Sequence, residues 1–277
     1  MEMQSLTDRD YAMIRSLLHQ RSGIALGASK KALVAGRLHK RVQRLGLPSY
    51  SAYFALLASG SDPEEVQEAV ELLTTNETYF FREPQHFRLL ADIARDAAKG
   101  KIFRVWSAAC SSGEEAYTIA VTLQEVVRKS HPLNWQVRGS DINTRVLEKA
   151  DSALYDCDRI EGIAPDLLKR YFLQGTGPYE GQMLVDPALC KRVDFAQINL
   201  VDPLPELVPF DVIFLRNVMI YFEADIKRRV VQQLLSTLVP DGVLIVGMAE
   251  NLNGLVDGLV CIGPGAYRLE RRAARAP

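Results

Sequence analysis

Residues 102–127 read IFRVWSAACSSGEEAYTIAVTLQEVV, and this stretch decides the fold. Its apolar opening, 102–106, predicts a short strand, and the small residues that follow predict a tight turn. From 116 to 127 the apolar residues recur at helical spacing, with Ile119 and Leu123 on one face. A strand that enters a helix through such a turn is the first half of a βαβ unit. The stretch therefore predicts a parallel sheet covered by helices.

The alternation of strand and helix continues towards the end of the chain. The expected strands are 135–139, 211–215 and 243–246, and the expected helices begin after Asn143 and span 224–238. Asp241-Gly242 predicts a turn before the last of these strands, and 266–270 predicts an additional edge strand. Together the segments predict an α/β fold, in which helices lie on both faces of a largely parallel sheet.

Over about 155–195 this alternation stops. The run GTGPYEG at 175–181 is rich in turn-forming residues and precedes the apolar residues 183–185. Such a run between short apolar segments is typical of a hairpin. We therefore expect a small antiparallel β-subdomain inserted into the α/β domain.

Residues 1–73 predict a separate all-helical domain, which leaves 74–277 for the α/β domain. Thr7, Asp8 and Asp10 precede an apolar run at helical spacing and predict the capped start of its first helix.

A second helix, expected over 29–45, carries a basic face. Its positive side chains fall within an arc of roughly 100° on a helical wheel, with no acid among them: Lys30, Arg37, Lys40, Arg41 and Arg44. Residues 1–50 carry nine Lys and Arg against three Asp and Glu, so their formal charge is +6 and that of the rest is −7. Either a solvated helix face or an acidic partner explains this basic arc.

The chain has 277 residues, of which 48% are hydrophobic and 24% are charged, as is typical of globular proteins. Its four cysteines are far apart and form no CxxC spacing, so reduced thiols are expected, without a disulfide or a metal site. The opening MEMQSLTDRDYAMI lacks a basic segment followed by an apolar one, and no run of about 18 apolar residues occurs. We therefore expect a cytoplasmic protein without membrane insertion.

Residues 73–87, LTTNETYFFREPQHF, do not follow the period of an amphipathic helix. Hydrogen-bonding side chains, among them Asn76, Thr78 and Arg82, crowd around three consecutive aromatic residues. This mixture favours the wall of a ligand site. The alternative is an interdomain linker whose aromatic side chains fill a hydrophobic seam.

Ligands of open α/β sheets bind beyond the carboxyl ends of the strands, where the chain carries three motifs. The first is SAACSSGEE at 107–115. Its Glu114 and Glu115 would repel a phosphate and suit a cationic ligand, although an acidic helix N-terminus is the alternative.

The second motif is Asp141, which ends the next expected strand. Its carboxylate is suited to accept both hydroxyl groups of a ribose, although a helix N-cap would also explain it. The third motif follows strand 211–215 and contains Arg216, Asn217 and Tyr221, which we favour as site residues over caps.

Together these motifs resemble the CheR family of chemotaxis receptor methyltransferases. The similarity extends over nearly the whole chain in the family's order, through TNETYFFRE, VWSAACSSGEEAYTIA, GSDINTRVLEKA, YFLQGTGPYEG, VDFAQINL, FLRNVMIYF and GMAENL. It implies a Rossmann-like, S-adenosylmethionine-dependent methyltransferase fold. It also implies an enzyme that methylates glutamate side chains of chemoreceptors and releases S-adenosylhomocysteine. Because a glutamate carboxylate is ionised at neutral pH, no general base is needed.

Carried over position by position, the resemblance implies a set of cofactor contacts: Asn76, Thr78, Arg82, Glu114 or Glu115, Asp141, Asn199, Leu200, Arg216 and Asn217. As catalytic residues, Arg82 and Tyr221 would lie nearest the transferred methyl group. No metal is implied.

The resemblance also implies that the basic helix docks the helical bundle of a chemoreceptor, through Arg37, Lys40, Arg41 and Arg44. In some family members the β-subdomain binds a receptor's C-terminal peptide. A monomer without a nucleic-acid partner is expected.

Two alternatives stay open. A nucleic-acid methyltransferase of the same fold is disfavoured by a pI near 6.5, and by Arg-Asn-Val-Met-Ile-Tyr where Asn/Asp-Pro-Pro-Tyr is typical. A non-catalytic cofactor-binding scaffold is disfavoured by the presence of Arg82 and Tyr221.

Overall fold

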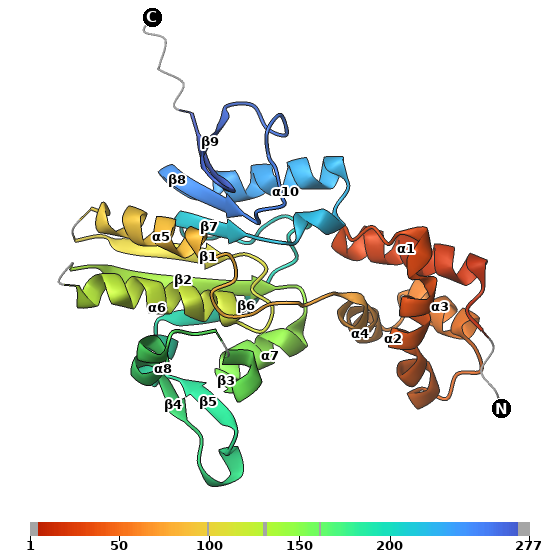
Figure 1. Ribbon diagram of the computed structural model, residues 1–277. Coiled ribbons are helices and arrows are strands. Elements are labelled where there is room, and N and C mark those ends of the chain that lie inside the picture. The colour runs from red at the N-terminus through yellow and green to blue at the C-terminus, as the bar shows by residue number, and fades with distance from the viewer. Residues whose placement is uncertain (1–4, 99, 130–131, 161, 271–277) are drawn as a thin grey trace, which may run out of the picture. The chain divides into compact units, whose positions relative to one another are not determined.

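The computed structural model describes residues 5–98, 100–129, 132–160 and 162–270 (Figure 1). Its contacts divide the chain into two compact units. The helical unit comprises Met1–Thr75 and Tyr221–Ile226, and the sheet unit comprises Asn76–Ile220 and Lys227–Pro277. Within the described ranges, no helix is long and apolar enough to cross a membrane.

The described part of the helical unit contains α1 (Asp8–Ser22), η1 (Ala28–Lys30), α2 (Lys31–Arg44), α3 (Tyr50–Ser59) and α4 (Pro63–Leu73). The predicted start of α1 is confirmed. The Thr7 hydroxyl accepts the Asp10 N–H and the Asp10 carboxylate accepts the Thr7 N–H, which makes a capping box. Apolar residues at helical spacing, such as Ile14 and Leu18 of α1 and Leu38 of α2, form the core of this unit.

The sheet unit is built on a seven-stranded sheet of order β6-β2-β1-β7-β8-β10-β9. Its strands are β1 (Ile102–Ser107), β2 (Asn134–Asp141), β6 (Val193–Gln197), β7 (Phe210–Leu215), β8 (Leu238–Val246), β9 (Leu259–Gly263) and β10 (Ala266–Leu269). The first five strands in this order are parallel, and β10 and β9 add antiparallel pairs. The carboxyl ends of the parallel strands share one edge, where a ligand site is expected.

Helices alternate with these strands: α5 (Gln85–Arg95), α6 (Glu114–Arg128), α7 (Thr144–Ser152) and α10 (Ala224–Ser236). Val212 and Phe214 of β7 join side chains of α5 and α6 in one buried cluster. Ile213 and Leu215 alternate with them and are buried on the opposite face, and the buried side chains of α10 also lie outside this cluster. The predicted α/β fold is confirmed.

The inserted segment forms a second, three-stranded antiparallel sheet of order β3-β5-β4. Its elements are β3 (Leu154–Asp156), η2 (Cys157–Ile160), α8 (Pro165–Tyr171), β4 (Phe172–Gln174), η3 (Gly177–Tyr179), β5 (Gln182–Val185) and α9 (Pro187–Cys190). The expected hairpin is β4 and β5. Its turn requires glycine at 175, because a Cβ there would lie 2.0 Å from the Tyr179 carbonyl oxygen.

Several local features differ from the sequence predictions. The prediction of a turn at Asp241-Gly242 is wrong, because β8 continues through both residues. Asp241 instead has φ 68°, and the pairing of β8 with β7 shifts its register there, as in a β-bulge. The terminal strand β10 is not an edge strand, because β9 pairs along its outer side. The helix α5 was not expected, since its apolar residues follow directly on the polar and aromatic stretch 73–87.

Candidate functional site

Asp141 stands at the carboxyl end of β2, between two loops. The Ser111 N–H donates to its Oδ2 at 2.9 Å and the Asn143 N–H donates to its Oδ1 at 3.0 Å. The Ser111 hydroxyl donates to the carbonyl oxygen of Asn76 at 2.9 Å. Ser111 therefore joins two predicted cofactor residues. The helix-cap explanation of Asp141 is wrong, because Asn143 caps α7.

Asn199 and Leu200 follow β6, the neighbour of β2 in the sheet. The Ile198 N–H donates to the Asp141 carbonyl oxygen at 3.1 Å, so their turn begins beside Asp141. Leu200 is buried, and its carbonyl oxygen accepts a hydrogen bond of 3.2 Å from Gln233 of α10. The ends of β1, β2 and β6 thus meet around Asp141.

The two consecutive glutamates that open α6 have different partners. Glu114 is fully buried and accepts hydrogen bonds from Arg159 at 2.6 Å and from the Ser112 hydroxyl at 2.7 Å. Glu115 accepts a hydrogen bond of 2.7 Å from Arg216. Both carboxylates are thus engaged by protein groups, and a cofactor contact from one of them stays a prediction.

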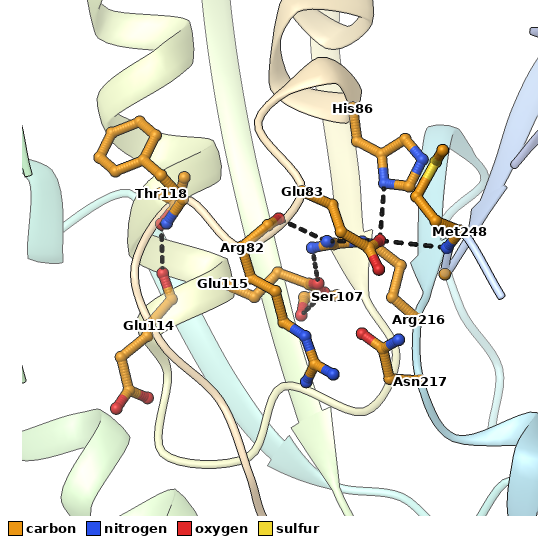
Figure 2. A network of polar contacts seen from close by, with 12 residues as sticks. Arg82, Glu83, His86, Ser107, Glu114, Glu115, Thr118, Arg216, Asn217 and Met248 are labelled. Carbon is orange, nitrogen blue, oxygen red and sulfur yellow. Dashed lines mark hydrogen bonds and ion pairs between the residues drawn. The ribbon is translucent and has the colours of Figure 1, made fainter. Parts of the chain in front are cut away.

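The guanidinium of Arg216 is the centre of a buried network at the end of β7 (Figure 2). Its side chain is 2% exposed. It donates to Glu115 at 2.7 Å, to Glu83 at 2.9 Å and to the carbonyl oxygen of Arg82. Its Cζ also lies 5.4 Å from the centroid of the Phe87 ring, a cation–π distance. Since these partners hold the guanidinium, we expect any cofactor contact at Arg216 from its backbone.

The NETYFFRE segment (residues 76–83) adopts an unusual backbone. Phe81 and Glu83 both have φ 58°, in the left-handed region that residues other than glycine rarely adopt. Tertiary hydrogen bonds hold both residues: the Phe81 N–H donates to the Thr118 hydroxyl at 3.1 Å, and the Glu83 carboxylate accepts a hydrogen bond of 2.9 Å from Arg216. In Figure 2 the Glu83 carboxylate lies inside the Arg216 network, whereas the side chain of Arg82 extends away from it.

Arg82 is instead held within the NETYFFRE segment. Its Nη1 donates to the Glu77 carbonyl oxygen at 3.0 Å, and its Cζ lies 5.7 Å from the centroid of the Tyr79 ring. Tyr79 is 51% exposed. The Arg82 guanidinium and the Tyr79 ring therefore lie against each other, and neither is buried.

The neighbouring phenylalanines have a different role. The Phe80 ring packs edge-on against Tyr155 and Phe172, with centroids 5.0 and 5.4 Å apart, and Phe87 stacks on Phe214 at 5.7 Å. Both phenylalanines are buried within the sheet unit. These two rings are therefore part of the core of the sheet unit, and the alternative of an interdomain seam filled by the rings of the stretch 73–87 stays untested.

His86 connects the network to the turn between β9 and β10. It is 1% exposed, its Nε2–H donates to the Pro264 carbonyl oxygen at 3.0 Å, and its Nδ1 lies 3.4 Å from the Glu83 carboxylate. Burial and the nearby Arg216 lower the pKa of His86. Burial also opposes ionisation of Glu83, but the hydrogen bond and charge of Arg216 hold the pKa of Glu83 below its usual value.

The lowered pKa of His86 predicts a loss of stability in weak acid. The unfolded chain, in which this histidine has a pKa of about 6.5, takes up the proton before the folded chain does. The free energy of unfolding should therefore fall as the pH drops below about 6.5, and should not depend on this group above it. Urea unfolding at pH 7.5, 6.5 and 5.5 should show a shallower fall for His86→Gln. His39→Gln, at an exposed position of α2, is the control, and equal falls in both variants would refute the prediction.

Asn217 follows Arg216 in a left-handed conformation, with φ 58°. Its N–H and the N–H of Gly247 both donate to the same oxygen of Glu250, each at 2.8 Å. A Cβ at Gly247 would lie 2.6 Å from the side-chain amide nitrogen of Asn217 and 2.9 Å from the Glu250 carboxylate, so a larger residue there would have to displace these side chains. Glu250 thus fixes Asn217 where β7 and β8 end.

Tyr221 belongs to the helical unit. It ends η4 (Met219–Tyr221), and its carbonyl oxygen accepts the Ala25 N–H at 2.8 Å, next to a bridge between Ile24 and Phe222. Its predicted place near the transferred methyl group stays a prediction.

The four predicted docking residues on α2 fall into two groups. Arg37 donates two hydrogen bonds of 2.8 Å to carbonyl groups at the end of α4, and Arg41 forms an ion pair with Glu65, which is 2% exposed. Lys40 and Arg44 are exposed. The acid that pairs with the basic arc comes from α4, so a wheel of α2 alone could not reveal it.

Several residues that organise the site were not singled out from the sequence. Glu83 and His86 lie three apart in the quoted stretch, a spacing that is compatible with a pair on one helical turn. Ser111 and Arg159 gave no such signal, because their partners are distant in the chain. Among the described residues, no group of three or more His, Cys, Asp or Glu side chains could hold a metal ion.

Comparison with known proteins identifies both units. Residues 76–263 match the family model of the CheR methyltransferase SAM-binding domain, and residues 9–74 match that of the CheR all-alpha domain. The chain is 42% identical to the chemotaxis protein methyltransferase of Escherichia coli K12, over 98% of this chain and 94% of that protein. Chemotaxis protein methyltransferase 2 of Pseudomonas aeruginosa is 41% identical, over 88% and 87% of the two chains.

Solved structures are more distant. The match to the N-methyltransferase NodS of Bradyrhizobium japonicum WM9 covers 68% of this chain and 96% of that chain, at 15% identity and a TM-score of 0.38. The two family models together span nearly the whole chain, and the sequence identities extend over the same length. The chain therefore belongs to the CheR methyltransferase family and binds S-adenosylmethionine through its sheet unit.

Proposed function

We propose that this methyltransferase transfers the methyl group of S-adenosylmethionine to glutamate side chains in the cytoplasmic helical bundle of a chemoreceptor. The observation that carries the proposal is the junction of Asp141, Ser111 and Asn76, which joins the NETYFFRE segment to the strand-end acid. The chemotaxis protein methyltransferases among its relatives support the choice of substrate.

The donor set at the strand ends suits this cofactor. Asp141 offers a carboxylate for the ribose hydroxyls, beside Asn76, Asn199 and Leu200, and the loop after β1 has two glutamates where a phosphate site would need cations. When bound, the cofactor supplies a methyl group on a positively charged sulfur.

The protein's part in the reaction is to orient the substrate and exclude water. The substrate carboxylate is already ionised, and its negative charge disappears as the neutral ester forms, so a site with little water favours the transfer. Arg82 would orient the incoming carboxylate, with Tyr79 along the wall, and Tyr221 is the second proposed catalytic residue. Too tight an ion pair with Arg82 would stabilise the ground state more than the transition state.

Incubation with S-adenosylmethionine carrying a labelled methyl group tests the proposal. Chemoreceptor-containing membranes, tRNA and DNA are offered separately, and the receptors are then mapped by mass spectrometry. We expect alkali-labile methyl esters on receptor glutamates. Label in nucleic acid alone would favour the nucleic-acid methyltransferase, and tight S-adenosylhomocysteine binding without ester formation would favour the scaffold.

We further propose that residues 1–73 serve as the docking domain and 74–277 as the catalytic domain. Of the four predicted docking residues, Arg37 and Arg41 bind groups of the helical unit itself. Lys40 and Arg44 are exposed, so we assign the docking to these two. A receptor's C-terminal peptide could add to the edge strand β4, beside the exposed Leu173. We propose a monomeric, cytoplasmic enzyme.

Reversing two charges tests the docking surface. The double variant Lys40→Glu with Arg44→Glu should raise the KM for receptor about tenfold at low salt, because α2 then loses the positive potential that attracts the glutamate-bearing receptor bundle. The affinity for S-adenosylhomocysteine should not change, and the difference should shrink at 1 M salt, where the Debye length is about 3 Å. Lys191→Glu with Arg229→Glu changes the net charge equally at exposed positions of the sheet unit. Equal KM values for the two double variants would contradict docking through α2.

A further inference from the structure

Arg159 extends from the inserted subdomain to two parts of the cofactor site. It lies in η2, directly after β3, and its Nη2 donates to the Glu114 carboxylate at 2.6 Å and to the Thr78 carbonyl oxygen at 3.1 Å. One guanidinium therefore joins the start of α6 to the NETYFFRE segment. Neither the sequence motifs nor the implied cofactor contacts include this arginine.

The contact with Glu114 is electrostatically important. This carboxylate is completely buried, and it accepts hydrogen bonds from Arg159 and from the hydroxyl of Ser112, which donates at 2.7 Å. A buried carboxylate that loses its cation is strongly unfavourable, so Glu114 holds the guanidinium in place. The guanidinium is thereby fixed where it can reach Thr78.

The same small sheet holds the site at two further points. The Tyr155 hydroxyl, from β3, donates to the Ser112 carbonyl oxygen at 2.7 Å. Gly113 has φ 92°, which favours glycine, and a Cβ there would lie 2.8 Å from that of Ala150 and 2.9 Å from the Tyr155 hydroxyl, so the loop lies in close contact with α7 and the small sheet. The rings of Tyr155 and Phe172 enclose Phe80. The inserted subdomain thus contacts Ser112 and Glu114 on one side and Thr78 and Phe80 on the other.

We propose that Arg159 is a positioning residue of the cofactor site, through which the inserted subdomain holds the Thr78 backbone and the Glu114 carboxylate in their binding arrangement. The inference rests on the proposed placement of the cofactor beside Thr78, but not on the identity of the methyl acceptor. The inserted subdomain is accordingly a structural part of the cofactor site, whatever it binds on its outer edge.

The protein provides a matched control in Arg170. This arginine also comes from the inserted subdomain and also binds a carboxylate of α6, Glu125, at 2.7 Å. Its side chain is 33% exposed and that of Arg159 is 40% exposed. Two differences remain. Arg159 also contacts the NETYFFRE segment, and Glu125 keeps Arg128 as a second cation when Arg170 is removed.

The test compares Arg159→Ala with Arg170→Ala in the full chain, by calorimetric titration with S-adenosylhomocysteine in the absence of receptor. Loss of a charge-assisted hydrogen bond should weaken binding by about 10- to 100-fold in Arg159→Ala and should spare Arg170→Ala. The KM for S-adenosylmethionine should rise by a similar factor, while kcat at saturating cofactor stays within about threefold. Because the titration omits receptor, an incorrect substrate assignment would leave its result unchanged.

A rescue experiment separates positioning from a general loss of stability. The partial exposure of Arg159 allows a small cation to enter its place, so methylguanidinium should restore part of the affinity of Arg159→Ala, and ethylammonium should restore less. Equal affinities of the two alanine variants would overturn the proposal. So would a loss of affinity that follows the thermal unfolding temperature and does not respond to methylguanidinium.

Discussion

Replacing Arg216 by methionine is expected to lower the free energy of unfolding by about 3–5 kcal/mol and to reduce methyl transfer to background. Its guanidinium is almost fully buried and is an ion-pair partner of both Glu83 and Glu115. Methionine fills a similar volume but leaves two carboxylates without their cation. It also removes the donor to the Arg82 carbonyl oxygen, which helps to fix the backbone of a predicted catalytic residue.

Urea unfolding and a methyl-transfer assay measure the two effects separately. Arg170→Met removes an ion pair with a 33% exposed guanidinium and should cost at most about 1 kcal/mol without affecting transfer. Adding Glu83→Gln and Glu115→Gln to Arg216→Met should recover much of the stability, because the buried charges are then absent. Transfer should not recover in that triple variant. Unchanged stability of Arg216→Met would show that the ion pairs are not the support of this site.

Asp141→Ala is expected to weaken S-adenosylhomocysteine binding by about 1.5–3 kcal/mol, or roughly 10- to 150-fold, the scale of hydrogen bonds to a charged group. The physical reason is the loss of a carboxylate whose two oxygens match the two ribose hydroxyls. The same oxygens accept the N–H groups of Ser111 and Asn143, so the loop after β1 should loosen as well. Calorimetric titration measures the affinity directly.

Asn143→Ala is the control for the structural part of this effect. It removes the N-cap of α7 and should cost about 1 kcal/mol of stability, with little change in cofactor affinity. If both variants weaken binding equally, the ribose assignment is incorrect and Asp141 acts only on the loop.

The sequence was sufficient to predict elements whose pattern is local. The stretch 102–127 gave a strand, a turn and a helix, and the structure has β1 and α6 there. The capping box of α1 and the hairpin of β4 and β5 also rest on residues close together in the chain. Asp141 could be identified because a strand end is a position that the alternation itself defines.

Contacts between distant residues could not be predicted in this way. Arg216 and Glu83 are 133 positions apart, and Arg159 and Glu114 are 45 apart, so no periodicity links them. The left-handed backbone at Phe81 and Glu83 was equally hidden, because non-glycine residues reach it only when tertiary contacts impose it. Arg216 could therefore be named from its place after a strand, whereas its partner Glu83 and the ion pair of Arg159 with Glu114 could not.

The ion pair between Arg41 and Glu65 has a consequence for how fast partners meet. A charge that is neutralised within its own fold contributes little to the potential that a distant acidic surface feels, so the diffusional capture radius depends on the uncompensated cations. The association rate should consequently decrease less steeply with ionic strength than the +6 of residues 1–50 would suggest. Composition sets the sign of this attraction, and the fold sets its magnitude.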